Sequence, residues 1–188
     1  MHLGTSCTAV GRHEPVPPDG SQLTLAEHWN GSTWTAQRTP NPANPEANLA
    51  AVACSSPANC TAVGNNLPAV AVFQTLAEHW NGSTWAIQPT PNPAKAQSGS
   101  LTGLWGVSCP TASSCTAAAT FAPTNFTANA AAEYWTGTAW QIQATAQPAA
   151  GQHLVAVSCV SAHVCTAVGG IVTKGTNGKL QLPLAERE

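Results

Sequence analysis

The sequence repeats itself with a period of about 53 residues, and this repeat restricts the possible folds more than any other feature. One element reads Cys-Thr-Ala-Val-Gly and begins at four places, the third copy being degenerate: Cys7, Cys60, Cys115 and Cys165. A second element, Leu-Ala-Glu-His-Trp-Asn-Gly-Ser-Thr-Trp, follows in step at residues 25–34 and 76–85, more loosely at 131–140, and as a first fragment at 184–186. Such a tandem repeat indicates a supersecondary unit that is stable when it is stacked on copies of itself.

Each unit is predicted to contain four short strands. The first strand covers residues 49–54, 104–109 and 154–159, the second is the Cys-Thr-Ala-Val-Gly element, and the third is the Leu-Ala-Glu-His-Trp element. The fourth strand follows a turn at Asn30-Gly31 or Asn81-Gly82, because Asn-Gly is typical of hairpins, and covers residues 34–39, 85–90 and 140–145. Since no segment has an apolar period of 3.6 residues, we expect an all-β chain.

Four-stranded units repeated in tandem predict a β-propeller. The chain is expected to hold three strands of a first blade, two complete blades and three strands of a fourth, which is a partial β-propeller of about 3.5 four-stranded antiparallel blades. The units are predicted at residues 1–48, 49–103, 104–153 and 154–188, as one array that is a fragment of a longer one. The tryptophans would pack between the blades. A β-trefoil, which is also built from units of four strands, is the alternative fold.

Six of the seven cysteines fall into pairs that are six positions apart: Cys54 with Cys60, Cys109 with Cys115, and Cys159 with Cys165. Each pair would join the first predicted strand to the second, where opposed Cβ atoms come close enough for a disulfide. Free buried cysteines and a metal site are the alternatives, although this spacing does not suit zinc. Cys7 lacks a partner because Met1 lies six positions before it. Three disulfides predict an extracellular or cell-surface location, and no signal peptide is visible in the first residues.

Charged residues make up only 7% of the chain, with six Lys and Arg against eight Asp and Glu. No nucleic-acid partner is expected, because binding to phosphates requires clustered basic side chains. No membrane span is expected either, because the chain has no run of about 18 apolar residues. Nucleophile, metalloprotease and phosphate-loop motifs are absent from the sequence, so we predict no catalytic residue, metal or cofactor.

The turn sequence Gly-Ser-Thr-Trp, at residues 31–34 and 82–85, resembles the end of the Asp-box of sialidase-like propellers. The aspartate that names this motif is replaced here by Trp29 and Trp80. The whole unit also resembles the tandem Trp- and Cys-containing repeats of secreted actinobacterial proteins that are expected to be propellers. This resemblance covers almost the entire chain, and it implies a propeller fold and secretion without implying any catalytic residue.

Glutamates recur in every unit, at Glu27, Glu78, Glu133 and Glu186, and we predict a structural role for them, because catalysis takes place at one position only. They are expected to bond amide, hydroxyl or indole groups of a neighbouring strand. Residues that break the repeat are better candidates for binding. Trp105, in the neighbourhood of Ala51 and Val155 of the other units, is either a stacking platform or a core filler; the remaining candidates are Phe121, Asn125 and His153.

The function predicted from these features is that of a secreted or cell-surface propeller module that binds a polysaccharide or a surface protein without catalysis. One alternative is a fragment of a propeller glycoside hydrolase or lyase whose active site lies outside this chain. Another alternative is a structural spacer array. Missing blades of the same chain, or self-association, are expected to cover the open ends of the partial ring.

Overall fold

The computed structural model describes residues 6–17, 20–43, 46–69, 72–92, 102–121, 128–143, 145, 151–175 and 178–187. Over this part of the chain the protein is all-β, with fourteen strands and no helix. The strands are β1 (Cys7–His13), β2 (Leu23–Trp29), β3 (Trp34–Gln37), β4 (Ala47–Ser56), β5 (Asn59–Ala69), β6 (Val72–Trp80), β7 (Trp85–Gln88), β8 (Gly103–Thr111), β9 (Ser114–Phe121), β10 (Asn129–Trp135), β11 (Trp140–Gln143), β12 (Gln152–Ser161), β13 (Val164–Gly175) and β14 (Gly178–Arg187).

The strands form four antiparallel sheets, one from each repeat unit. The first sheet is β1-β2-β3, the second β4-β5-β6-β7, the third β8-β9-β10-β11 and the fourth β12-β13-β14. Consecutive strands pair in every sheet, so each unit is a simple meander. The predicted numbers of three, four, four and three strands are therefore confirmed.

The turn between the third and fourth strands lies where it was predicted, in the four residues between the two tryptophans. In the first sheet Trp29 pairs directly with Trp34, and residues 30–33 form the loop. The Asn30 side-chain oxygen accepts hydrogen bonds from the backbone N–H groups of Ser32 and Thr33, each at 3.0 Å. Gly31 has a φ of 99°, which a residue with a Cβ rarely adopts. Asparagine therefore acts through its side chain, and glycine alone provides the left-handed backbone.

A β-bulge recurs between the first and second strands of the last three sheets. The ladder skips one residue after Leu49, Leu104 and Leu154, so that Ala50, Trp105 and Val155 are the extra residues. Gly64, opposite the bulge in the second sheet, could not carry a side chain, because a Cβ there would collide with the Asn48 carbonyl oxygen. A bulge redirects the side chain of its extra residue, which matters below for Trp105.

Three disulfides join the first two strands of the last three sheets, as predicted. The bonded pairs are Cys54–Cys60, Cys109–Cys115 and Cys159–Cys165, with Cα atoms 3.9, 4.1 and 4.0 Å apart. Cys7 holds the corresponding position in the first sheet, where it is a free, exposed thiol.

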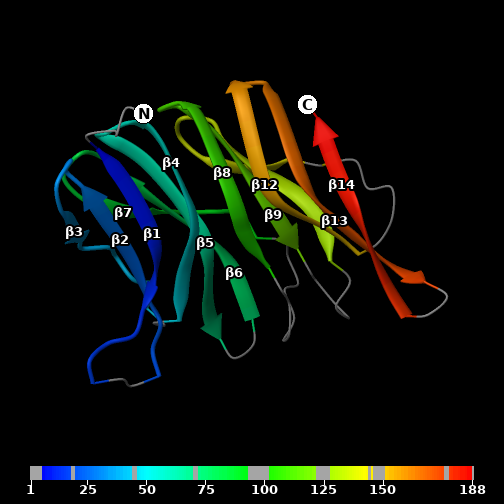
Figure 1. Cartoon of the computed structure of the whole chain (residues 1–188), viewed down its shortest axis with the longest axis horizontal. Helices are drawn as coiled ribbons and strands as arrows, with labels where there is room; N and C mark the ends of the chain where they lie inside the picture. Colours follow the sequence, from blue (N-terminus) through cyan, green and yellow to red (C-terminus); the bar gives the residue numbers. More distant parts are fainter. Residues whose placement is uncertain are drawn as a thin grey trace.

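The four sheets stack face to face in chain order, from blue to red in Figure 1. The first strand of each later sheet packs on the face of the sheet before it, as β8 does on β4 and β5. Apolar clusters fill the interfaces, and Leu49, Leu104 and Leu154 are fully buried in them. Because a sheet of this kind has two apolar faces, stacking on neighbours is what removes both faces from water.

Polar contacts recur at successive interfaces. The indole N–H of Trp85 donates to the Gln37 side-chain oxygen at 2.8 Å, and Trp140 donates to Gln88 at 2.9 Å. Threonine hydroxyls also approach the disulfide sulfur of the next sheet, at 3.8, 3.6 and 3.5 Å for the pairs Thr8/Cys60, Thr61/Cys115 and Thr116/Cys165. The repeat in the sequence is thus a repeat of contacts between sheets as well as within them.

Candidate functional site

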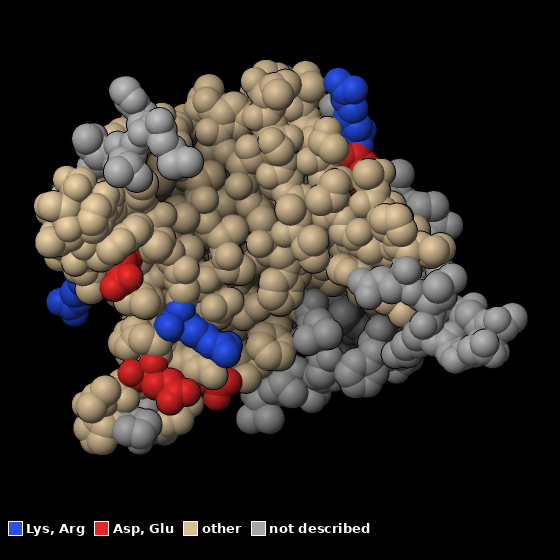
Figure 2. Space-filling view, in the orientation of Figure 1, with Lys and Arg blue, Asp and Glu red and all other residues tan. Residues whose placement is uncertain are grey.

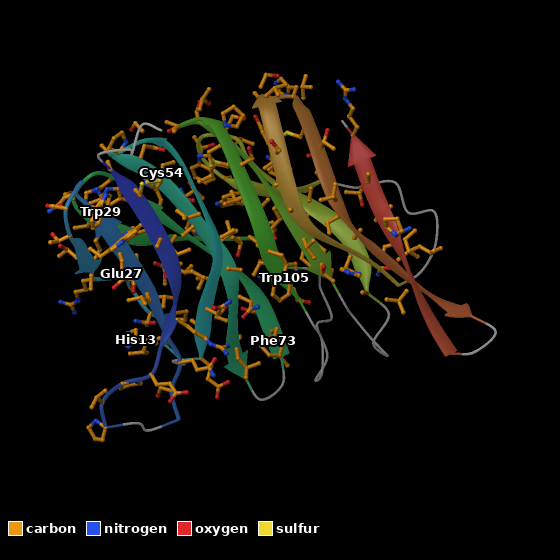
Figure 3. The ribbon with its side chains drawn as sticks, viewed as in Figure 1. His13, Glu27, Trp29, Cys54, Phe73 and Trp105 are labelled. Carbon is orange, nitrogen blue, oxygen red and sulfur yellow. A yellow bond between two sulfur atoms is a disulfide. The ribbon has the colours of Figure 1, made fainter. Side chains whose placement is uncertain are left out.

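A cleft of about 390 Å³ opens where the first three sheets meet, at the end of the strands away from the disulfide of Cys54 (Figure 3). We call it the aromatic cleft. It is lined by Arg12, Gln22, Glu46, Ala47, Asn48, Asn65, Phe73, Thr102 and Trp105. Its volume lies in the range of about 300–1000 Å³ that is usual for pockets that hold small ligands.

Trp105 reaches the cleft because it is the extra residue of the bulge in β8. Its ring lies over Gly103, where a Cβ would come within 3.2 Å of Trp105 Cζ2 and 3.1 Å of Asn65 Nδ2. The absence of a side chain at Gly103 therefore gives the indole its place beside the Asn65 amide. The second and fourth units have Asn48 and His153 at this position, so only the third unit has the combination of tryptophan and glycine.

Phe73, near the start of β6, provides the second aromatic ring, and both rings are half-buried. Figure 3 shows Phe73 and Trp105 near the same end of the neighbouring sheets. Two backbone hydrogen bonds hold this end together: Ala47 N–H donates to the Gln22 carbonyl at 2.7 Å, and Leu67 N–H donates to the Glu46 carbonyl at 2.8 Å. The cleft is thus built on paired backbone.

The cleft has little net charge. Arg12 and Glu46, both exposed, carry opposite charges, while Gln22, Asn48 and Asn65 contribute uncharged amides. Lys, Arg, Asp and Glu also occupy few places on the face that Figure 2 shows. Each amide side chain can both donate and accept hydrogen bonds, which suits a ligand with many hydroxyl groups better than a strongly charged ligand.

The residues proposed from the sequence are not gathered in one place. Trp105 lines the cleft, whereas Phe121 is only 6% exposed and packs in the core between the second and third sheets. His153 is half-buried at the start of β12 and is not part of the cleft lining, and Asn125 lies outside the described residues. Phe73 was not predicted from the sequence. This residue breaks the repeat as Trp105 does, since no other unit has an aromatic residue at its position.

Two of the repeated glutamates, Glu78 and Glu133, lie between the sheets, whereas Glu27 is half-buried on the first sheet. Glu78 and Glu133 are fully buried, and no hydrogen bond of good geometry reaches their carboxyl oxygens. Burial raises the pKa of both residues from 4.5 to about 8, and the hydroxyls of Thr24 and Thr75 on the preceding sheets offset this only in part. Both carboxyls are therefore protonated at neutral pH, and both lie in an interface rather than in a cleft.

The hydroxyl groups near these carboxyls already have acceptors for their hydrogens. Thr24 donates to Thr39 Oγ1 at 2.9 Å, and Thr75 donates to Thr90 Oγ1 at 2.9 Å. Since each hydroxyl hydrogen is already used, desolvation remains the larger effect on the pKa of Glu78 and Glu133. The predicted hydrogen bonds to a neighbouring strand are therefore not found at Glu78 and Glu133, and the hydroxyl groups beside these carboxyls come from the preceding sheet.

A wider groove of about 1050 Å³ separates the outer edges of the first two sheets and is lined by residues that include His13, Arg38 and Trp80. A similar groove of about 400 Å³ lies between the third and fourth sheets. Because similar grooves lie between the first two sheets and between the last two, we attribute them to the distance between neighbouring sheets rather than to a binding site. No group of His, Cys, Asp and Glu side chains that could hold a metal ion occurs among the described residues.

Comparison of the sequence with protein-family models and with curated proteins gave no match. The described part of the chain also contains no helix that is long and apolar enough to cross a membrane. The function must therefore be inferred from the geometry of the aromatic cleft and from the disulfides.

Proposed function

We propose that this chain is a secreted or cell-surface β-propeller repeat module that binds a polysaccharide in the aromatic cleft without catalysis. The observation that carries the proposal is the position of Trp105. A bulge directs its ring into a cleft that also contains Phe73 and three amide side chains.

The propeller is supported by the way the sheets are arranged. Every ladder joins strands of a single unit, and the first strands β4, β8 and β12 lie next to one another in turn. Blades around a common axis have this arrangement, with their first strands innermost. Ladders confined to single units favour the propeller over the trefoil. The bulge residues Ala50, Trp105 and Val155 would then lie on the innermost strands.

Secretion is supported by the three disulfides, because such bonds persist in oxidising compartments. The small number of charged residues fits a surface that presents threonine, serine, asparagine and glutamine to water. Polysaccharides are accessible to a protein located outside the cell or on its surface.

A sugar suits the cleft for chemical reasons. The C–H groups on one face of a pyranose ring are apolar and stack on an aromatic ring, while the hydroxyls at its edge need hydrogen-bond partners. The rings of Trp105 and Phe73 offer the apolar surfaces, and the amides of Asn48, Asn65 and Gln22 offer donors and acceptors beside them. The low net charge of the cleft favours a neutral polysaccharide.

Binding is favoured over hydrolysis because Glu46 is the one acidic residue in the lining of the cleft. Hydrolysis of a glycosidic bond usually requires two carboxyl groups about 5–10 Å apart, one as acid and one as base or nucleophile. Glu78 and Glu133 are buried between the sheets and do not line the cleft.

The proposal is tested by binding to immobilised neutral oligosaccharides built from glucose, N-acetylglucosamine, galactose or mannose. We expect saturable binding to at least one of these probes, with no release of reducing ends. W105A should weaken that binding by at least about tenfold, equivalent to roughly 1.4 kcal/mol, because the stacking surface is lost. F73A should weaken it as well.

The control is I142A, which removes an exposed apolar side chain outside the cleft lining and should bind as the wild type does. Unchanged binding by W105A would refute the cleft as the site. Turnover of a probe would favour the glycosidase alternative, and the absence of binding to every probe would favour the spacer or a protein partner.

A further inference from the structure

The two outer faces of the stack expose positions that are buried at every internal interface. In the first sheet Trp34 is 49% exposed, while its counterparts Trp85 and Trp140 are 5% and 4% exposed. In the fourth sheet Val168 is 44% exposed, while its counterparts Val63 and Ala118 are fully buried against the following sheet. We call these two surfaces the Trp34 face and the Val168 face.

The two faces carry opposite halves of one contact. At each internal interface a threonine of one sheet lies 3.5–3.8 Å from a cysteine sulfur of the next. Thr166, on the Val168 face, occupies the threonine position and is exposed. Cys7, on the Trp34 face, occupies the cysteine position and is also exposed. Each face therefore matches the other face and does not match itself.

We propose that copies of this chain associate head to tail, with the Trp34 face of one copy packed on the Val168 face of the next. The association continues the interface that already joins each sheet to its neighbour within the chain. It places Trp34 and Leu25 of one copy against Val168 and Ala185 of the other, so that apolar side chains leave water on both sides. This inference does not depend on the proposed polysaccharide binding.

The association is heterologous, because two different surfaces of the chain meet. Two copies joined at one interface leave one Trp34 face and one Val168 face free, and these faces either meet and close the ring or take up further copies. The proposal therefore predicts self-association as the concentration rises, and the smallest ring that can close is a dimer of eight sheets. Substitutions in either face alone should prevent self-association.

A crosslink tests the proposed register. T166C places a thiol where the internal interfaces have a threonine hydroxyl within 3.8 Å of a cysteine sulfur. In a buffer of oxidised and reduced glutathione we expect disulfide-linked dimers and larger species on a non-reducing gel. Peptide mapping should identify the link between position 166 and Cys7. The double variant C7S/T166C and the variant T138C, which has a thiol on an exposed turn of the third sheet, should give no ladder.

A mixing experiment tests the two-face geometry without a covalent bond. W34K and V168K should each be monomeric by light scattering at concentrations at which the wild type forms oligomers. An equimolar mixture should give one-to-one dimers that do not grow, because each variant keeps one intact face. I142K, which changes an exposed apolar residue on β11, should associate as the wild type does.

The proposal would be overturned if the wild-type chain stayed monomeric at all concentrations. It would also be overturned if the crosslinked fraction of T166C were no larger than that of T138C. A further repeat unit or a different protein would then be the partner of these faces. Oligomers that persist in both W34K and V168K would overturn it as well, because they would require another interface.

Discussion

The buried carboxyls of Glu78 and Glu133 predict that the protein becomes less stable as the pH rises through neutrality. Burial raises the pKa of both groups from 4.5 to about 8. In the unfolded chain both groups have lost their protons well below pH 7, whereas in the folded chain they keep them. Unfolding therefore releases protons in this range, and the free energy of unfolding falls as the pH increases.

The expected size of the effect follows from these two values. From pH 6.5 to 7.5, each carboxyl should lower the free energy of unfolding by about 1.2 kcal/mol, so the pair should lower it by about 2.4 kcal/mol. Burial raises the pKa of Glu186 too, which acts in the same direction. Desolvation lowers the pKa of His79, which makes stability increase with pH until the unfolded imidazole has lost its proton, so it opposes the carboxyls by at most about 0.35 kcal/mol between pH 6.5 and 7.5.

The assay is urea unfolding at several pH values, followed by tryptophan fluorescence. The double variant E78Q/E133Q should lose most of the pH dependence, because glutamine does not titrate, and each single variant should lose about half. E14Q, which changes an exposed residue, should keep the wild-type slope. A wild-type stability that is constant or rises between pH 6.5 and 7.5 would refute the reasoning, since it would mean that the buried carboxyls are ionised in the fold.

Three further predictions concern the interfaces between sheets. W85A should lower the free energy of unfolding by about 3–5 kcal/mol in urea titrations, whereas W34A should lower it by less than about 1 kcal/mol, because only the first of these tryptophans is buried. Q37L should cost about 1–3 kcal/mol in the same assay, because it leaves the Trp85 indole N–H without its acceptor. G106V should prevent stable folding, as judged by near-UV circular dichroism, because a Cβ there would come within 2.8 Å of the Ala156 backbone of the next sheet; normal folding would contradict the close approach of these sheets.

The sequence predicted the local architecture well because the repeat contains several independent copies of each signal. Strand positions, the order of pairing and all three disulfides follow from the alignment of the cysteine and Leu-Ala-Glu elements. The turn that contains Asn30-Gly31 was also placed correctly, and the asparagine side chain caps its four residues.

The contents of the interfaces and of the cleft were harder to predict. The two tryptophans of a unit look alike in sequence, yet Trp85 is buried while Trp80 is half-buried, and the difference depends on the neighbouring sheet. Phe121 was predicted as a binding residue, but it lies at the end of β9 and packs in the core. The aromatic cleft draws residues from three units, so its composition depends on how the sheets stack, which local patterns do not specify.

The measurement that tests the stacking of the units most directly is a double-mutant cycle across one interface. W140F removes the indole N–H of the third sheet, and Q88L removes its acceptor in the second, at a donor–acceptor distance of 2.9 Å. We predict a coupling of about 1 kcal/mol or more in the free energy of unfolding, within the range of 0.5–3 kcal/mol that contacting residues show. Effects that add to within about 0.3 kcal/mol would contradict the contact, and with it the packing of the third sheet on the second.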